Sequence, residues 1–230
     1  MNVAFDFISD LNIKDQDQFD WTDKPTSLYC IVAGNVSDTL PVISMCLGHL
    51  SKLYQGVFYI PGYLEYSKST NYTKTTNDLA RVLKKFKNVA LLDHHVVIIN
   101  GVAILGCNGW HNQNKEDELT EIKITEYRYD DVIYLKNSVE KLQKHLDIKK
   151  IIIVSNAVPL NYLYYGESPK HLADTAELSL ALVSDSETKV CTWIFGTYGK
   201  MVETTIDKVK YVNNTFVQQP YWPKRVDIEI

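Results

Sequence analysis

The sequence has no apolar run that approaches the roughly 20 residues of a membrane-spanning helix. Its start, from Met1 to Asp10, lacks the basic region of a signal peptide and carries acidic residues where an apolar stretch would be needed. Charge of one sign is also scarce, because 24 basic and 28 acidic residues leave a net charge of −4 without a long basic run. We therefore expect a cytoplasmic protein with no membrane contact, and nucleic acid binding has no compositional support.

Reactive motifs are missing as well. The four cysteines are far apart and form no CxxC pair, so a cysteine-based zinc site is disfavoured and buried free thiols are expected. No Gly-x-Ser-x-Gly elbow is present, which argues against a hydrolase with a serine nucleophile.

Short apolar runs rich in β-branched and aromatic residues recur along the chain and predict buried strands. Between them, apolar residues at helical spacing predict helices, as in Val42 to Leu53 and Val132 to Leu146. The predicted strands are Val3 to Ile8, Leu28 to Ala33, Val57 to Ile60, Val96 to Ile99, Val102 to Leu105, Ile151 to Val154 and Val190 to Phe195.

The order of these elements predicts a mixed α/β sandwich. Strands alternate with helices in the first half, which indicates parallel pairing, whereas the closely spaced runs at Val96 to Leu105 and Met201 to Val212 indicate antiparallel pairs. The polar segment Ser67 to Asn77 is expected to be an exposed loop. No linker or repeat divides the chain, so we expect residues 1–230 to form one domain.

Segments that follow predicted strands carry the chemistry of open α/β sheets, and five of them resemble motifs of one family in the family's order. The family patterns are Ser-Asp-Leu-His, Ala-Gly-Asp-Ile-Ser-Asp, Pro-Gly-Asn-His-Glu, Thr-His-His-Ala-Pro and Gly-His-Thr-His. The matching segments are Phe7 to Asn12, Val32 to Asp38, Tyr59 to Tyr66, Ile153 to Pro159 and Trp193 to Gly199. The chain thus resembles the calcineurin-like metallophosphoesterases over nearly its whole length.

The resemblance implies a four-layer αββα sandwich, in which two mixed β-sheets are flanked by helices and a dinuclear metal site lies where the loops converge. In such a site, two divalent ions about 3.5–4 Å apart activate a hydroxide and clamp a phosphate. At that separation the ions repel by roughly 17 kcal/mol at an effective dielectric near 20, so anionic ligands must compensate.

At the positions that resemble the family's ligands, this sequence retains one of seven, Asp10. The bridging carboxylate is replaced by Asn35, and the histidine expected to assist the leaving group is replaced by Leu64. The other replaced ligand positions are Asn12, Tyr63, Asn156, Thr197 and Gly199. We therefore expect no metal, no cofactor and no catalytic residue at this site. One exposed carboxylate with amides offers at best a weak site for a hard cation.

Displaced histidines could rescue a metal site. Two histidines, His94 and His95, lie next to each other where a turn is expected and are the candidates for a relocated metal-binding pair. A third, His111, falls near the mouth of the pocket that the resemblance implies. The remaining histidines, His49, His145 and His171, fall in or at the start of predicted helices. None has a partner at ligand spacing in the sequence.

The leading hypothesis is a catalytically inactive protein that binds a protein partner or another copy of itself. The aromatic residues that surround the replaced ligands suit an interface: Tyr63, Tyr66, Phe195 and Tyr198. Against this, Phe195 could simply extend a core strand and Tyr63 could fill the space that the metals left.

Two alternatives stay open. A residual phosphoesterase could use one metal on Asp10 and Glu65, or a small-molecule sensor could bind a ligand through the amides of Asn12, Asn35 and Asn156. The abundance of Tyr, Lys, Asn and Ile suits an AT-rich genome such as that of a bacteriophage, which would place the protein in a host cytoplasm.

Overall fold

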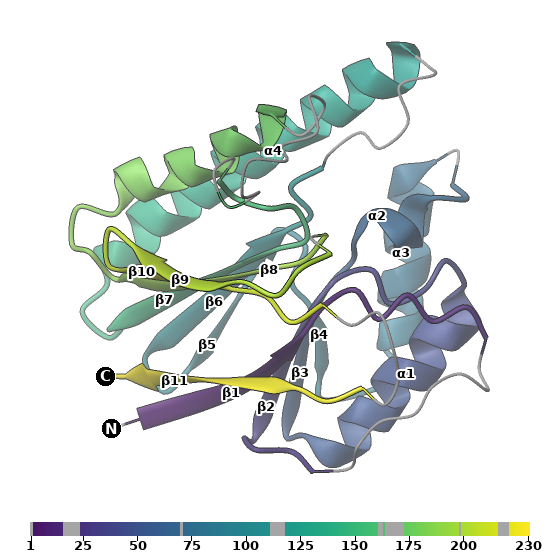
Figure 1. Cartoon of the computed structure of the whole chain (residues 1–230), viewed down its shortest axis with the longest axis horizontal. Helices are drawn as coiled ribbons and strands as arrows, with labels where there is room; N and C mark the ends of the chain where they lie inside the picture. Colours follow the sequence, from purple (N-terminus) through teal and green to yellow (C-terminus); the bar gives the residue numbers. More distant parts are fainter. Residues whose placement is uncertain are drawn as a thin grey trace.

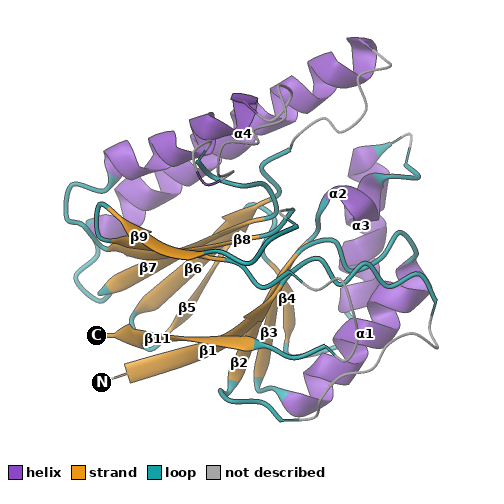
Figure 2. Cartoon of the chain, in the orientation of Figure 1, coloured by secondary structure: helices purple, strands orange, loops and turns teal. Residues whose placement is uncertain are grey.

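Two β-sheets pack face to face, and helices cover both outer faces (Figures 1 and 2). The computed structural model describes residues 2–15, 24–69, 71–110, 118–160, 163, 173–197, 199–215 and 221–230. The predicted αββα sandwich is confirmed. None of the described helices is both long and apolar enough to cross a membrane.

The first sheet has the strand order β11-β1-β2-β3-β4. Strands β1 to β4 run parallel, as the alternation of strands and helices predicted, and β11 pairs antiparallel with β1 at the edge. Helix α1 connects β2 to β3, and α2 and α3 connect β3 to β4. The bounds are β1 (Asn2–Ile8), β2 (Tyr29–Ala33), α1 (Leu40–Leu53), β3 (Gly56–Ile60), α2 (Tyr63–Tyr66), α3 (Tyr72–Leu83), β4 (Val89–Leu91) and β11 (Lys224–Glu229).

The second sheet has the order β5-β6-β7-β8-β10-β9. Strands β6, β7, β8 and β10 run parallel, whereas β5 and β9 pair antiparallel with their neighbours, as predicted for both closely spaced runs. The bounds are β5 (His95–Ile99), β6 (Val102–Cys107), α4 (Glu118–Gln143), β7 (Lys150–Ser155), the 3₁₀ helix η3 (Ala173–Ser184), β8 (Val190–Phe195), β9 (Glu203–Ile206) and β10 (Val209–Val212).

The central apolar layer lies between the two sheets. Phe5 and Ile31 from the first sheet meet Ile104, Ile152 and Ile194 from the second, and all five are fully buried. Since the strands are covered on both faces, they read as continuous apolar runs, which explains why the sequence revealed them. Each such side chain contributes roughly 1.5–3 kcal/mol of burial free energy, so this layer fixes how the two sheets meet.

Two helix expectations need correction. The segment expected to be an exposed loop contains the start of α3, because the Asn71 side chain accepts a hydrogen bond from the Lys74 amide (2.9 Å) and caps the helix. Its apolar face is carried by Leu79 and Leu83. In the second half of the chain, α4 stops at Gln143, so Leu146 lies beyond the helix with 85% of its surface exposed.

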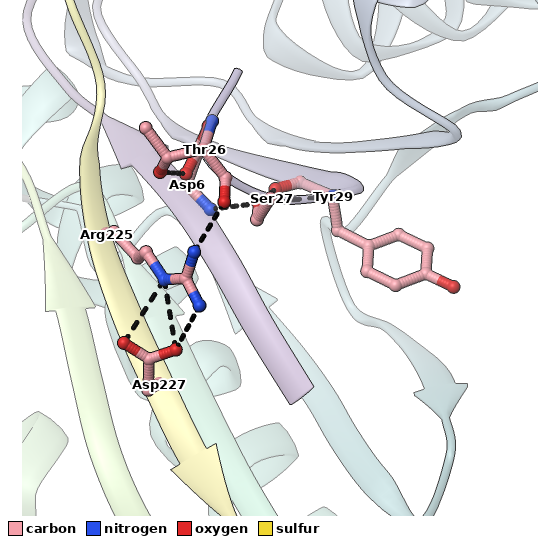
Figure 3. Close-up of polar contacts among 6 residues, drawn as sticks. All are labelled: Asp6, Thr26, Ser27, Tyr29, Arg225 and Asp227. Carbon is pink, nitrogen blue, oxygen red and sulfur yellow. Dashed lines mark hydrogen bonds and ion pairs between the residues drawn. The ribbon is translucent and has the colours of Figure 1, made fainter. Parts of the chain in front are cut away.

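A buried carboxylate ties the amino end of β2 to β1. Asp6 of β1 accepts hydrogen bonds from the Thr26 amide (2.8 Å), the Thr26 hydroxyl and the Tyr54 hydroxyl (2.9 Å). Arg225 of β11 donates to the Thr26 carbonyl at 2.6 Å and pairs with Asp227 (Figure 3). The hydrogen bonds from Thr26 and Tyr54 satisfy a charge on Asp6 that would otherwise be costly to bury.

Candidate functional site

The segments that leave β1, β2, β3, β7 and β8 converge at the carboxyl ends of these strands. They bring together the side chains of Asp10, Asn35, Asn156 and Thr197, together with the backbone amides of Tyr63 and Leu64. The fold therefore brings these residues together at one place.

Asp10 is the centre of this cluster, and both of its carboxylate oxygens are occupied. Oδ1 accepts hydrogen bonds from Asn35 Nδ2 (2.7 Å) and the Thr197 amide (2.9 Å), and Oδ2 accepts one from the Thr215 hydroxyl (2.8 Å). Burial raises the pKa of Asp10, and these hydrogen bonds partly oppose that rise. Protein donors thus occupy the oxygens that a metal ion would otherwise use.

The amide of Asn156 continues the network. Its Oδ1 accepts from the Thr197 hydroxyl (2.7 Å) and the Tyr63 amide (3.2 Å), and its Nδ2 donates to the Ala33 carbonyl (3.1 Å). Asn35 Oδ1 accepts from the Leu64 amide (2.9 Å). We call the hydrogen-bonded side chains of Asp10, Asn35, Asn156 and Thr197 the Asp10 network.

Glycines let the backbone close tightly on the Asp10 network. A Cβ atom on Gly62 would lie 2.5 Å from Asn35 Oδ1, and one on Gly34 would lie 2.5 Å from Asn156 Nδ2. Gly34 also has a φ of +79°, in the left-handed region that favours glycine. The amides of Asn35 and Asn156 are therefore packed against backbone on the sides that face these two glycines.

Glu65 holds the loops that carry the Asp10 network. It is buried and accepts hydrogen bonds from three backbone amides and from the Tyr59 hydroxyl (2.9 Å). The three amides belong to Asn35 (3.1 Å), Val36 (2.7 Å) and Gly62 (2.7 Å). Burial raises the pKa of Glu65, and these hydrogen bonds oppose the rise. Both carboxylates are thus buried, so the expectation of one exposed carboxylate available to a cation is wrong.

The backbone at this site is strained. Asp10, Asn12, Asn35 and Thr197 have φ values of 54°, 49°, 57° and 56°. Asn and Asp tolerate the left-handed region, whereas a β-branched residue such as Thr197 does so rarely. Strain of this kind concentrates at functional sites and persists only where the surroundings enforce it.

Several predicted positions do not join the network. The Asn12 side chain is exposed and donates to the Asp10 carbonyl (2.9 Å), and Gly199 is exposed with nothing within 4 Å of where a Cβ atom would lie. Tyr66 is 2% exposed because it packs against α3, where its hydroxyl bonds to Thr76. Phe195 is 0% exposed because it ends a core strand. Their side chains offer no surface to a partner, which corrects that expectation. Tyr198 lies outside the described residues.

Comparisons with known proteins identify the fold. No protein-family model matches the sequence, and no curated protein matches it either. Among solved structures, phosphopantetheinyl hydrolase from Mycobacterium tuberculosis has a TM-score of 0.64 at 13% identity, over 92% of this chain and 88% of that one. The fold is of the metallophosphoesterase type.

Two further structures share the fold at low identity. A protein described as a 5′-nucleotidase from Staphylococcus aureus has a TM-score of 0.56 at 11% identity, over 94% of this chain but only 49% of that one. GAP50, the anchor in the inner membrane complex of Plasmodium, has a TM-score of 0.54 at 14% identity, over 93% of this chain and 71% of that one.

The dinuclear metal centre that this fold implies does not fit the residues at its expected place. The Asp10 network supplies one carboxylate, whose oxygens already accept three hydrogen bonds, together with two amides and a hydroxyl. Among the described site positions there is no imidazole and no second carboxylate that could bridge two ions. The charge needed to hold two cations together is therefore missing.

The histidines require one correction. His94 Nε2 lies 2.5 Å from Asp131 Oδ1 on α4, so the fold gives this histidine a partner that sequence spacing did not show. His95 is exposed on β5 and does not join this contact, and His145 lies just past the end of α4 rather than inside a helix. His111 and His171 lie outside the described residues. No sequence signal links His94 to Asp131, which is 37 residues away.

Proposed function

We propose that this chain is a catalytically inactive protein that uses a metallophosphoesterase-type fold as a binding or scaffold module. The observation that carries the proposal is the 2.7 Å hydrogen bond from the Asn35 amide to Asp10 Oδ1. At the position where the resemblance implies a bridging carboxylate, a neutral amide donates a hydrogen bond to Asp10 and adds no second negative charge.

The completeness of the Asp10 network supports the same proposal. In a metal site without its ions, several polar atoms would point at an empty position. Here, the Asn35 amide donates a hydrogen bond to the Thr197 hydroxyl, which in turn donates one to Asn156 Oδ1. A buried network that is fully satisfied stabilises one conformation. The residues that replaced the ligands thus act as structural residues that hold the two sheets together.

The fold alone does not decide between catalysis and binding. The solved neighbours include a hydrolase and a protein described as an anchor, so the donor set at the site has to decide. The residual phosphoesterase is not favoured because Asp10 and Glu65 are buried and hydrogen-bonded. The sensor that uses amides is not favoured because Asn35 and Asn156 bond to protein groups.

We further propose that the partner is a protein or a second copy of this chain. Four aromatic residues are candidates for such contact, and three of them lie among the described residues. Of these three, Tyr63 is partly exposed and lies at the rim of the Asp10 network. A partly exposed tyrosine offers a large contact area at low entropic cost.

The purified protein is expected to show no Mn²⁺-dependent hydrolysis of a generic phosphomonoester or phosphodiester above a mock preparation. Loss of the metal-bound hydroxide and of the charge clamp removes several kcal/mol of barrier lowering, and each 1.36 kcal/mol is about tenfold in rate. Release of 4-nitrophenol from its phosphate esters provides the measurement. A sustained Mn²⁺-stimulated rate that disappears in Asp10→Ala would overturn the proposal.

A further inference from the structure

A second group of ligand-type side chains lies away from the Asp10 network, where the turn between β4 and β5 meets α4. Asp93 and His94 belong to the turn, and Asp131 lies on α4. One potential ligand atom from each residue lies within 4.8 Å of the other two. We call these three residues the Asp93 cluster.

The protein holds two members of the cluster in fixed positions. Asp131 is buried, its Oδ2 accepts a hydrogen bond from the Gly109 amide (2.6 Å), and its Oδ1 contacts His94 Nε2 (2.5 Å). The His94 ring stacks on Tyr134, with 4.5 Å between the ring centroids and an interplanar angle of 10°. An imidazole and a carboxylate are thus already positioned next to each other before any ion arrives.

Asp93 is the member of the cluster whose carboxylate has no hydrogen-bond donor among the described residues, although the residue is partly buried. One of its carboxylate oxygens lies within 4.8 Å of a carboxylate oxygen of Asp131 and of a ring nitrogen of His94. Two carboxylates in one buried place favour a cation between them.

The cluster is accessible from a pocket. A cavity of about 250 Å³ is lined by all three members together with Asp130 and the rings of Tyr72, Trp110 and Tyr127. An ion could therefore reach the cluster from solvent, and a water or a ligand in the pocket could complete its coordination. Three protein ligands and one open coordination position are typical of catalytic zinc sites, in which water or substrate takes the fourth position.

We propose that Asp93, His94 and Asp131 bind one divalent cation of the zinc or manganese class. One imidazole and two carboxylates match the ligand preference of these ions and neutralise a charge of +2. Neighbouring ligand atoms of a tetrahedral ion are about 3.4 Å apart, given metal–ligand distances near 2.1 Å. The ligand atoms of the cluster, which lie within 4.8 Å of one another, are already close to that spacing. The site is separate from the dinuclear centre that the fold implies.

Calorimetric titration of chelator-treated protein with Zn²⁺ alone tests this proposal. We expect one equivalent to bind, and we expect His94→Ala and Asp93→Asn each to weaken binding at least tenfold. Asp93→Asn is the sharper variant, because its carboxylate accepts no hydrogen bond from the described residues and its loss relieves repulsion from Asp131. It should weaken Zn²⁺ binding without lowering the unfolding midpoint, which a purely structural role of Asp93 would not produce.

Two neighbours serve as matched controls. His95→Ala removes the adjacent exposed imidazole, and Asp130→Asn removes an exposed carboxylate that lines the same pocket. Both variants should bind Zn²⁺ as the unaltered protein does. The proposal is overturned if the unaltered protein gives no saturable binding, if Asp93→Asn and His94→Ala bind as tightly as it does, or if the controls lose affinity equally.

Discussion

Replacement of Glu65 by alanine is expected to lower the free energy of unfolding by at least about 4 kcal/mol, which is among the largest effects of a single substitution. Four donors point at this one buried carboxylate, three of them backbone amides at 2.7–3.1 Å. A buried donor left without a partner costs about 1–3 kcal/mol, although water that enters the cavity would recover part of the loss. Urea unfolding followed by circular dichroism gives the measurement.

The control for this substitution is Glu140→Ala on the exposed face of α4, where the carboxylate pairs with Lys144. That variant should unfold close to the unaltered protein. Glu65→Gln should fall between the two, because it keeps the volume but turns an amide NH₂ toward donors. If Glu65→Ala unfolded like Glu140→Ala, Glu65 would not organise the loops that form the Asp10 network.

Reintroduction of a carboxylate by Asn35→Asp is expected to destabilise the metal-free protein by about 2–4 kcal/mol at pH 7. The new carboxylate oxygen would stand where Asn35 Nδ2 lies 2.7 Å from Asp10 Oδ1. Two carboxylates at this distance cannot both ionise, so the folded state retains a proton that the unfolded state releases.

The pH dependence of Asn35→Asp has a definite sign. The folded-state pKa of the pair is raised above the unfolded value near 4, so the folded state binds the extra proton between those two pKa values. Stability relative to the unaltered protein should therefore fall as the pH rises from about 4 to 7 and recover on acidification. Asn12→Asp, at an exposed position, should show little of this dependence. An Asn35→Asp variant more stable than the unaltered protein at pH 7 would contradict the hydrogen-bond assignment.

The sandwich itself could be predicted from the sequence because its strands are buried on both faces. Runs such as Ile151 to Val154 are apolar throughout and reveal themselves without an alternating pattern. Strand β11 was missed because it lies at a sheet edge and alternates Val226 and Ile228 with exposed charges. Helix α3 was missed because its start reads as a polar loop until Asn71 is recognised as a cap.

The two candidate sites differed in how far the sequence could reveal them. The Asp10 network consists of residues that directly follow strands, so the ends of parallel strands place them together and the resemblance supplied their order. Their mutual hydrogen bonds could not be predicted, because they depend on how closely the backbone at Gly34 and Gly62 packs against the Asn156 and Asn35 side chains. The Asp93 cluster combines a turn with the middle of a long helix, and no spacing rule connects two such positions.

We expect that the Asp10 network does not assemble a pair of metal ions. Anomalous diffraction from a crystal soaked in Mn²⁺ tests it most directly, since it locates each ion independently of any activity. We predict no pair of anomalous peaks beside Asp10 and Asn35, whether or not a single peak occurs at the Asp93 cluster. Two strong peaks about 3.5–4 Å apart between Asp10 and Asn156 would contradict the claim.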